Sequence, residues 1–236
     1  MAAIQRVLVT GAAGALGSRV CARFSEAGLT VIAADLPQAV PAESTEIHAD
    51  ADDKNLHWIG LDLREPAAVR DGVDAIEKNI GAIDALVHCA GGFRWALMGE
   101  VSDDDIDFLL DANLRSSLLL LREILPKMKA QNLGRIVLMS SKSTLNPQQG
   151  EGPYAATKAA LNALTKSVAD EVKALDVTIN ALLPTVIDTP ANRDAMPDSD
   201  FDKWVTRDQL ADIIFGLTQP TGAPINGALI PVSGKM

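Results

Sequence analysis

The sequence predicts a single-domain, doubly wound α/β fold, and three observations support that prediction. The chain has 236 residues, 47% of them hydrophobic, which suits one sizeable core. Short β-branched runs alternate with amphipathic helical segments along the whole length. No run of 18 apolar residues, internal repeat or low-complexity linker interrupts that alternation. A parallel sheet covered by helices on both faces is therefore expected over residues 1–236.

About seven strands and five helices are expected. The strands are short apolar runs at residues 7–10, 30–35, 57–62, 84–90, 135–140, 177–183 and 227–232. Helical segments long enough to cross a parallel sheet lie near residues 15–27, 66–79, 103–130, 153–173 and 206–218. Two segments rich in turn formers remain. Residues 36–56 are expected to form a surface loop, and residues 188–205 a lid.

Composition narrows the class of protein. The formal net charge of −10, without a basic run, would repel nucleic acid and anionic lipid, so neither is an expected partner. The N-terminal segment runs directly into a strand and lacks the features of a signal peptide, which predicts a cytoplasmic protein. Cys21 and Cys89 lie far apart and are interpreted as free thiols. The three histidines show no metal-ligand spacing, so no metal site is expected.

A glycine-rich segment, TGAAGALG at residues 10–17, follows the first expected strand and opens the first helix. Gly11, Gly14 and Gly17 would allow a tight turn, close approach of a pyrophosphate, and helix packing. The unpaired amides at a helix N-terminus favour such an anion. The pattern predicts a Rossmann-type dinucleotide site, with an ordinary structural turn as the alternative.

Two aspartates end strands near that turn. Asp35 ends the second expected strand, 18 residues after Gly17, where a carboxylate would bind both ribose hydroxyls and repel a 2′-phosphate. This favours NAD over NADP, unless Asp35 is a solvated loop residue. Asp62 ends the third strand and either contacts the adenine or caps the next helix.

The candidate catalytic residues lie in the second half of the chain. Tyr154 and Lys158 are four residues apart, which places both on one face of a helix. An ammonium beside a phenol favours the phenolate, so Lys158 would make Tyr154 a usable acid or base at neutral pH. Ser141 ends the fifth expected strand, at the sheet edge where ligands bind, and could hold a substrate oxygen. Asn113 is a costly residue inside a long helix, which points to a function or to a solvent-facing position.

These motifs, taken in order and spacing, resemble the short-chain dehydrogenase/reductase family over nearly the whole chain. The resemblance rests on TGAAGALG, Asp35, CAGG at residues 89–92, Asn113, Ser141, Tyr154 with Lys158, and LLPTVIDTP at residues 182–190. It implies that Tyr154 donates or accepts the proton, that Lys158 binds the nicotinamide ribose, that Ser141 orients the substrate, and that Asn113 anchors a relay water. It also implies cofactor contacts at Ala13, Leu16, Leu63, Ala90, Gly91, Pro184, Ile187 and Thr189.

Two segments depart from the family pattern, and two others resemble one kind of reductase within the family. The sequence has His88 and Cys89 where the family has two asparagines, and Thr185 after Pro184 where the family has glycine. GALGSR at residues 14–19 and LLPTVIDTPANRDAMPDSDF at residues 182–201 look most like dihydropteridine reductases, which also use NADH. Ser141 points instead to ordinary carbonyl or alcohol chemistry, because that reductase has alanine there.

Substrate contacts and subunit contacts are expected from two further sets of apolar residues. Pocket walls would come from Phe93, Trp95, Met98, Gln148, Gln149, Met196 and Trp204, with core packing as the alternative for each apolar one. The helices at residues 103–130 and 153–173 carry surplus apolar positions, which predicts a homodimer or homotetramer.

Three functions fit these observations. The first is an NAD(H)-dependent reductase or dehydrogenase for a small carbonyl or alcohol substrate, with Tyr154 as acid or base. The second is a dihydropteridine reductase that acts on quinonoid dihydropterin. The third belongs to another class, a catalytically silent NAD-binding regulator, since a fold does not fix a function.

Overall fold

The computed structural model describes residues 3–41 and 45–235. Ten strands lie in the described ranges: β1 (Arg6–Thr10), β2 (Thr30–Asp35), β3 (His48–Ala49), β4 (Leu56–Gly60), β5 (Ala85–His88), β6 (Gly134–Met139), β7 (Val177–Pro184), β8 (Ile187–Asp188), β9 (Val205–Thr206) and β10 (Leu229–Val232). The α-helices there are α1 (Ala15–Glu26), α2 (Pro66–Asn79), α3 (Asp103–Leu109), α4 (Ser116–Gln131), α5 (Gly152–Val172), α6 (Pro190–Ala195) and α7 (Arg207–Thr218).

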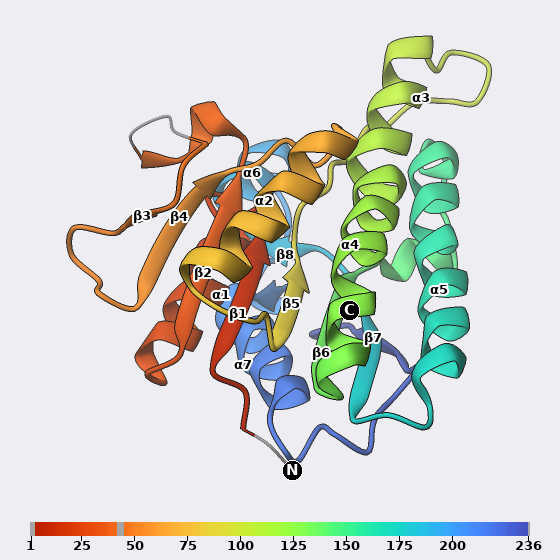
Figure 1. Cartoon of the computed structure of the whole chain (residues 1–236). Coiled ribbons are helices and arrows are strands. Elements are labelled where there is room, and N and C mark those ends of the chain that lie inside the picture. The colour runs from red at the N-terminus through yellow and green to blue at the C-terminus, as the bar shows by residue number, and fades with distance from the viewer. Residues whose placement is uncertain (1–2, 42–44, 236) are drawn as a thin grey trace.

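The central sheet has eight strands in the order β10-β7-β6-β5-β1-β2-β4-β3. All neighbours are parallel except β3, which pairs antiparallel with β4 at one edge. After β4 the chain crosses back to place β5 on the other side of β1 (Figure 1). The strand order reverses between β1 and β5, and in open α/β sheets that is where ligands bind.

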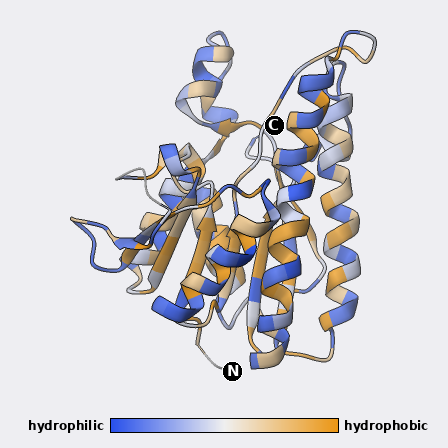
Figure 2. Cartoon of the chain, turned by 45° about the horizontal axis from the view of Figure 1, so that its top comes forward, coloured by the Kyte–Doolittle hydropathy of each residue, from blue (hydrophilic) through white to orange (hydrophobic). Residues whose placement is uncertain are grey.

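Helices cover both faces of the sheet because the strand side chains are apolar on both sides (Figures 1 and 2). One core joins alternate strand residues such as Leu8, Ile32 and Ile136 to α2, α4 and α5. The other joins the intervening residues, such as Val7 and Val137, to α1 and α7. The predicted single doubly wound sheet is thus confirmed as the fold of the described residues.

Three elements differ from the expectation. The segment at residues 36–56 adds the short edge strand β3, so the sheet has one strand more than predicted. The expected helix at residues 103–130 is divided by a π-helical turn at Leu110–Arg115. The hydroxyls of Ser116 and Ser117 bond back to the carbonyls of Ala112 and Asn113 at 2.7 and 2.8 Å, which competes with regular helix bonding there.

The third difference is the segment at residues 188–205, which is largely ordered. It contains α6, a 3₁₀ turn at Phe201–Lys203, and the parallel pair formed by β8 and β9. The Arg193 guanidinium donates to both carboxylate oxygens of Asp188, at 2.6 and 2.8 Å, and stacks over the Phe201 ring. Within the described ranges, no helix is both long and apolar enough to cross a bilayer.

Candidate active site

The glycine-rich turn fits closely against the end of β5. Gly11 has φ +67°, a conformation that favours glycine, and a Cβ there would lie 2.7 Å from the Ala90 backbone nitrogen. A Cβ on Gly17 would overlap the Gly11 carbonyl oxygen. Gly14, the N-cap of α1, has no side chain to bond the first amides of the helix. The turn therefore leaves backbone N–H groups available to a phosphate, as a dinucleotide requires.

Asp35 lies at the end of β2 beside this turn. Its carboxylate accepts hydrogen bonds from the Ala13 and Leu36 backbone nitrogens, at 2.9 and 2.8 Å. The nearest cation of the first helix, Arg19, is paired with Glu26 and Asp208. The strand end thus presents a fixed carboxylate, the arrangement that suits ribose hydroxyls better than a 2′-phosphate.

Asp62 and Leu63 lie on the same side of the sheet, after β4. Arg64 donates to both carboxylate oxygens of Asp62, at 2.9 and 2.7 Å, and holds the pKa of Asp62 below its ordinary value. The Leu63 side chain is buried in the core with α2. Neither residue lines the cavity described next.

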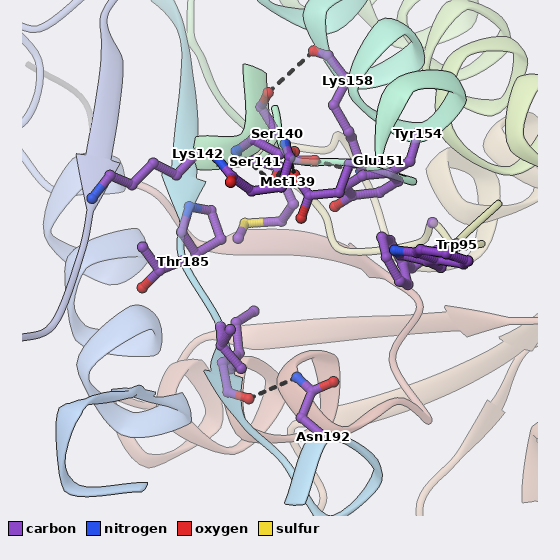
Figure 3. Close-up of a pocket in the computed structure, with 18 of the residues that line it drawn as sticks. Trp95, Met139, Ser140, Ser141, Lys142, Glu151, Tyr154, Lys158, Thr185 and Asn192 are labelled. Carbon is purple, nitrogen blue, oxygen red and sulfur yellow. Dashed lines mark hydrogen bonds between the residues drawn. The ribbon is translucent and has the colours of Figure 1, made fainter. Parts of the chain in front are cut away.

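A cavity of about 830 Å³ opens at the carboxyl ends of β5, β6 and β7 (Figure 3). Its lining includes Ser141, Tyr154 and Lys158 together, although Ser141 follows β6 and the other two lie on α5. Leu16, Gly91, Pro184 and Ile187, all expected at the cofactor, line it as well. The cavity therefore joins the dinucleotide turn to the candidate catalytic residues.

Tyr154 is set in the first turn of α5, facing the cavity. Its ring packs edge to face against Phe93, with 4.9 Å between the ring centroids. Burial raises the pKa of the Tyr154 phenol, a hydrogen bond with Ser141 opposes that shift, and the nearby Glu151 carboxylate adds to it. The phenol is protonated at neutral pH in this environment, which is the form that an acid needs.

Ser141 is held by residues of the 3₁₀ turn that follows it, Lys142–Thr144. The Ser143 backbone nitrogen donates to the Ser141 hydroxyl oxygen at 3.2 Å, and the two hydroxyls lie 2.8 Å apart. A hydroxyl accepts two hydrogen bonds and donates one. When the Ser143 hydroxyl donates, the acceptor positions of Ser141 are filled, so Ser141 is the donor toward the Tyr154 oxygen, and a substrate oxygen placed between the two would accept that hydrogen bond instead.

Lys158 is buried one turn beyond Tyr154 on α5. Its ammonium donates to the Met139 carbonyl at 2.8 Å and lies 5.9 Å from the centroid of the Tyr154 ring. Burial lowers the pKa of Lys158 to about 8. In this structure Lys158 therefore bonds the end of β6, and its expected effect on the pKa of Tyr154 is not observed.

Asn113 is fully buried in the π-helical turn rather than exposed to solvent. Its amide accepts from the Gly92 nitrogen at 2.9 Å and donates to the Gly92 carbonyl and the Thr157 hydroxyl, at 3.0 and 3.1 Å. Since both amide hydrogens are used, a water could bond only to the remaining acceptor sites of Asn113. The residue ties the loop after β5 to α5.

The expected pocket residues divide into two groups. Phe93, Trp95, Gln148 and Met196 line the cavity, whereas Trp204 is buried in the core outside it and packs on Phe201. Met98 and Gln149 are absent from the lining too, and Thr189 caps α6 by accepting from the Asn192 nitrogen at 3.2 Å. Trp204 and Met98 are corrections to the expected pocket walls, because the fold turns the first inward and the second to solvent.

The structure adds cavity residues that the sequence did not indicate, among them Cys89, Ser143, Glu151 and Asn192. Ser143 and Glu151 had a usable signal, since they lie two residues after Ser141 and three before Tyr154. Asn192 had none, because only the folding of the segment after β8 brings it to the cavity. Burial raises the pKa of the Cys89 thiol to about 12, so it stays protonated.

His88 replaces a family asparagine and forms a buried chain of hydrogen bonds. The Ser116 hydroxyl donates to the Ala112 carbonyl, so its oxygen accepts from His88 Nε2 at 3.3 Å. His88 Nδ1 then accepts from the Thr10 hydroxyl at 2.7 Å. Burial lowers the pKa of His88 to about 3, so the ring is neutral and links β1 to α4 through β5.

Comparison with known proteins agrees with this geometry. The family model described as short chain dehydrogenase matches residues 5–200. The chain belongs to this family. Oxidoreductase UcpA of Escherichia coli K12 is 34% identical over 184 residues, which cover 78% of this chain and 69% of UcpA. The 3-oxoacyl-[acyl-carrier-protein] reductase FabG of Thermotoga maritima is 27% identical over 237 residues, covering 97% and 96% of the two chains.

A third relative bears on the cofactor. An uncharacterized NAD-dependent oxidoreductase of Mycobacterium tuberculosis, Rv0687, is 29% identical over 255 aligned residues, covering 95% of this chain and 92% of its own. As a short-chain dehydrogenase with these relatives, the protein is an NAD(P)-dependent oxidoreductase that acts on CH–OH and C=O groups.

Proposed function

We propose that this short-chain dehydrogenase is NAD(H)-dependent, and that it reduces or oxidises a small carbonyl or alcohol substrate with Tyr154 as acid or base. The observation that carries the proposal is the convergence of Ser141, Tyr154 and Lys158 on the one cavity that also reaches the dinucleotide turn. A bound nicotinamide supplies or accepts hydride. The residues below hold it and move the proton.

The cofactor residues fit NAD. The amides of the turn at Gly11–Gly17 would bind the pyrophosphate, and Asp35 the adenosine ribose hydroxyls. Lys158 would bind the nicotinamide ribose, and the chain around Ile187 and Thr189 the carboxamide. Asp35→Ser should move the ratio of kcat/KM for NADH to that for NADPH toward NADPH by about tenfold or more, because it removes the charge that repels a 2′-phosphate. An unchanged ratio would contradict the preference for NAD.

In the reductive direction Tyr154 would donate its phenol proton to the substrate oxygen, and Ser141 would donate a hydrogen bond to the same oxygen. The raised pKa of Tyr154 keeps the proton in place at neutral pH, which favours reduction. Oxidation needs the phenolate, so its rate should rise with pH. A ribose hydroxyl bonded to Lys158 would bring positive charge closer to the phenol and offset part of the shift.

The test is NADH oxidation by purified protein with a panel of ketones, aldehydes and quinones. Tyr154→Phe should lower kcat by about 10²- to 10⁴-fold, the range typical of a lost general acid, and leave the Kd for NADH within about threefold. Ser141→Ala should lower carbonyl reduction as well. Full activity of the phenylalanine variant would rule out Tyr154 as the proton donor.

A second candidate is reduction of quinonoid dihydropterin. It is favoured by the segment at residues 182–201, whose Asn192 and Met196 line the cavity. This function predicts turnover of the dihydropterin that is insensitive to Ser141→Ala. A catalytically silent NAD-binding regulator, in contrast, would bind NADH and turn over none of these substrates.

We also infer a homodimer or homotetramer. Leu110 and Leu118 on the π-helical turn and α4 are 43% and 46% exposed, which leaves apolar surface for a second copy. Light scattering at micromolar concentration should show at least a dimer, and a monomer would refute the inference. A cytoplasmic location stays a prediction that cell fractionation would test.

A further inference from the structure

Glu151 brings a carboxylate to the wall that carries Tyr154. It is the N-cap of α5 and precedes Tyr154 by three residues, so the two side chains lie on the same face (Figure 3). Both line the cavity, and Glu151 is the acidic residue in that lining among the residues that the structure describes. Its charge adds to the raised pKa of Tyr154, but burial is the larger cause of that shift, and the cofactor site does not use the charge.

A backbone turn fixes the position of the Glu151 carboxylate. The Gln148 nitrogen donates to Oε2 at 2.8 Å, and the Glu151 nitrogen donates back to the Gln148 carbonyl at 3.1 Å. The carboxylate therefore closes the turn that precedes α5, and this bond occupies one of its two oxygens. No ion pair with Glu151 occurs in the described part of the chain, so its negative charge is free for a ligand.

Two aromatic rings line the same cavity as this carboxylate. The Trp95 indole nitrogen donates to the Gln149 carbonyl at 3.0 Å, and its ring fills the space that a Cβ on Gly150 would occupy. Phe93 packs against Tyr154. Trp95 is 58% exposed and Phe93 48% exposed, and both line the cavity. Exposed aromatic faces next to a carboxylate are a favourable environment for an organic cation.

Neither of the two lysines in the cavity lining forms an ion pair with Glu151 among the described residues. Lys158 is bonded to the Met139 carbonyl, and Lys142 extends to the side of the cavity opposite Tyr154 (Figure 3). The formal net charge of −10 also favours the approach of cations over anions. The negative net charge of the chain and the unpaired Glu151 carboxylate therefore favour the same sign of ligand charge.

We propose that Glu151, with Trp95 and Phe93, forms a subsite for a primary ammonium group, so that the substrate is an amino ketone or amino alcohol. This inference rests on the proposed reduction of small carbonyls and adds the class of substrate. The ammonium would donate to the free oxygen of Glu151 while the carbonyl oxygen lies between Ser141 and Tyr154. Keto acids would be poor substrates, because their carboxylate would meet Glu151.

The test compares aminoacetone with hydroxyacetone, which differ by an ammonium in place of a hydroxyl. The assay is NADH oxidation near pH 7, where Tyr154 stays protonated in every variant. Wild-type protein should show kcat/KM about tenfold or more higher for aminoacetone, as expected for a charge-assisted hydrogen bond. Glu151→Gln keeps an acceptor for the Gln148 nitrogen but removes the charge, and it should bring the ratio of kcat/KM for aminoacetone to that for hydroxyacetone close to one.

Glu171→Gln is the matched control, because it removes the same charge from an exposed position on α5. It should retain the preference for aminoacetone. Equal kcat/KM for the two ketones in the wild type, or the same preference in Glu151→Gln, would overturn the proposal.

A binding measurement separates this inference from the proposed function. If neither ketone is reduced, binding of benzylamine and benzyl alcohol to the protein–NADH complex, followed by NADH fluorescence, still reports on the subsite. Tighter binding of benzylamine that is lost in Glu151→Gln would support the subsite even where carbonyl reduction has failed. Equal binding of the two compounds would reject it.

Discussion

The cofactor end and the substrate end of the cavity are built in different ways. At the cofactor end, backbone groups and glycines from the consecutive elements β1, α1 and β2 form the site. At the substrate end, side chains from three distant loops meet, around Phe93 and Trp95, Ser141 to Glu151, and Thr185 to Met196. The shape of the first end is set by the backbone conformation of one short stretch of the chain. The second depends on the packing of loops against one another.

Because the two ends are built differently, substitutions at them should have different consequences. The turn cannot accept a Cβ on Gly11 or Gly17, because the nearest atoms are backbone atoms that cannot move aside. A loop of interacting side chains tolerates change in steps, since each hydrogen bond contributes separately. A single substitution in the glycine turn should therefore abolish most cofactor binding, whereas a single substitution in the loops should lower substrate turnover only in part.

Gly17→Ala should have the largest effect. The added methyl overlaps the Gly11 carbonyl, so the turn must shift and NADH affinity should fall by about 100-fold or more. Gly216→Ala in α7 is the matched control, because a Cβ there meets nothing within 4 Å. It should stabilise the fold by about 0.5–1 kcal/mol. Calorimetric NADH titration and thermal melts of both variants measure this contrast.

Lys158→Met should lower the activity of the protein while raising its stability. Because burial lowers the pKa of Lys158 from 10.5 to about 8, its charge disfavours the folded state below pH 8, and that penalty fades as pH rises toward 10.5. The variant should gain about 1–3 kcal/mol of unfolding free energy at pH 7, after the loss of the bond to Met139. Its kcat should fall by about 100-fold.

Urea titrations at pH 7 and pH 10 provide the readout for Lys158. The gain should be smaller at pH 10 than at pH 7. A variant less stable than the wild type at pH 7 would contradict the assigned cost of burial.

Ser143→Ala tests a hydrogen bond at the substrate end of the cavity. It removes the hydroxyl that is hydrogen-bonded to Ser141 but keeps the backbone nitrogen bond, so kcat for carbonyl reduction should fall by about tenfold. Ser143→Thr keeps a hydroxyl and should retain most of the activity. Steady-state kinetics with a fixed ketone measure both, and the Kd for NADH should not change. Equal kcat in all three proteins would show that Ser141 needs no such partner.

His88→Asn should have the smallest effect on activity, and the pH-dependent part of its effect on stability should be confined to acid. The folded-state pKa of about 3 lies below the ordinary 6.5, so the unfolded chain binds the extra proton and stability is lost as pH falls from 6.5 toward 3. Asparagine cannot bind that proton. Between pH 7 and pH 4.5 the drop in Tm should be smaller in the variant by about 5 °C. If Tm falls equally with pH in the two proteins, the titration of His88 does not contribute to the loss of stability in acid.

Much of the fold could be predicted because its signals are local. Apolar strands and amphipathic helices gave the doubly wound sheet, and the spacing of Tyr154 and Lys158 placed both on α5. The β3 edge strand was missed because a two-residue strand has no periodicity. The π-helical turn was missed because its cause is the back-bonding of Ser116 and Ser117, which propensity alone does not indicate.

The candidate site was predicted in part, for the same physical reason. Residues in motifs of fixed spacing, such as Ser141 and Tyr154, line the cavity as expected, whereas Trp204 is buried outside it. An apolar ring has the same signature in a core and in a pocket wall. Only the path of the chain between β8 and α7 distinguishes the two.

The sequence by itself determined the sheet, the glycine turn and the helix that carries Tyr154, because hydrophobic periodicity and backbone conformation are properties of neighbouring residues. The tertiary structure alone decided that Lys158 bonds Met139, that Ser143 supports Ser141, and that Trp95 bonds the Gln149 carbonyl at the cavity that Glu151 also lines. Those contacts join elements whose approach is set by the packing of the whole core, and no local pattern encodes them.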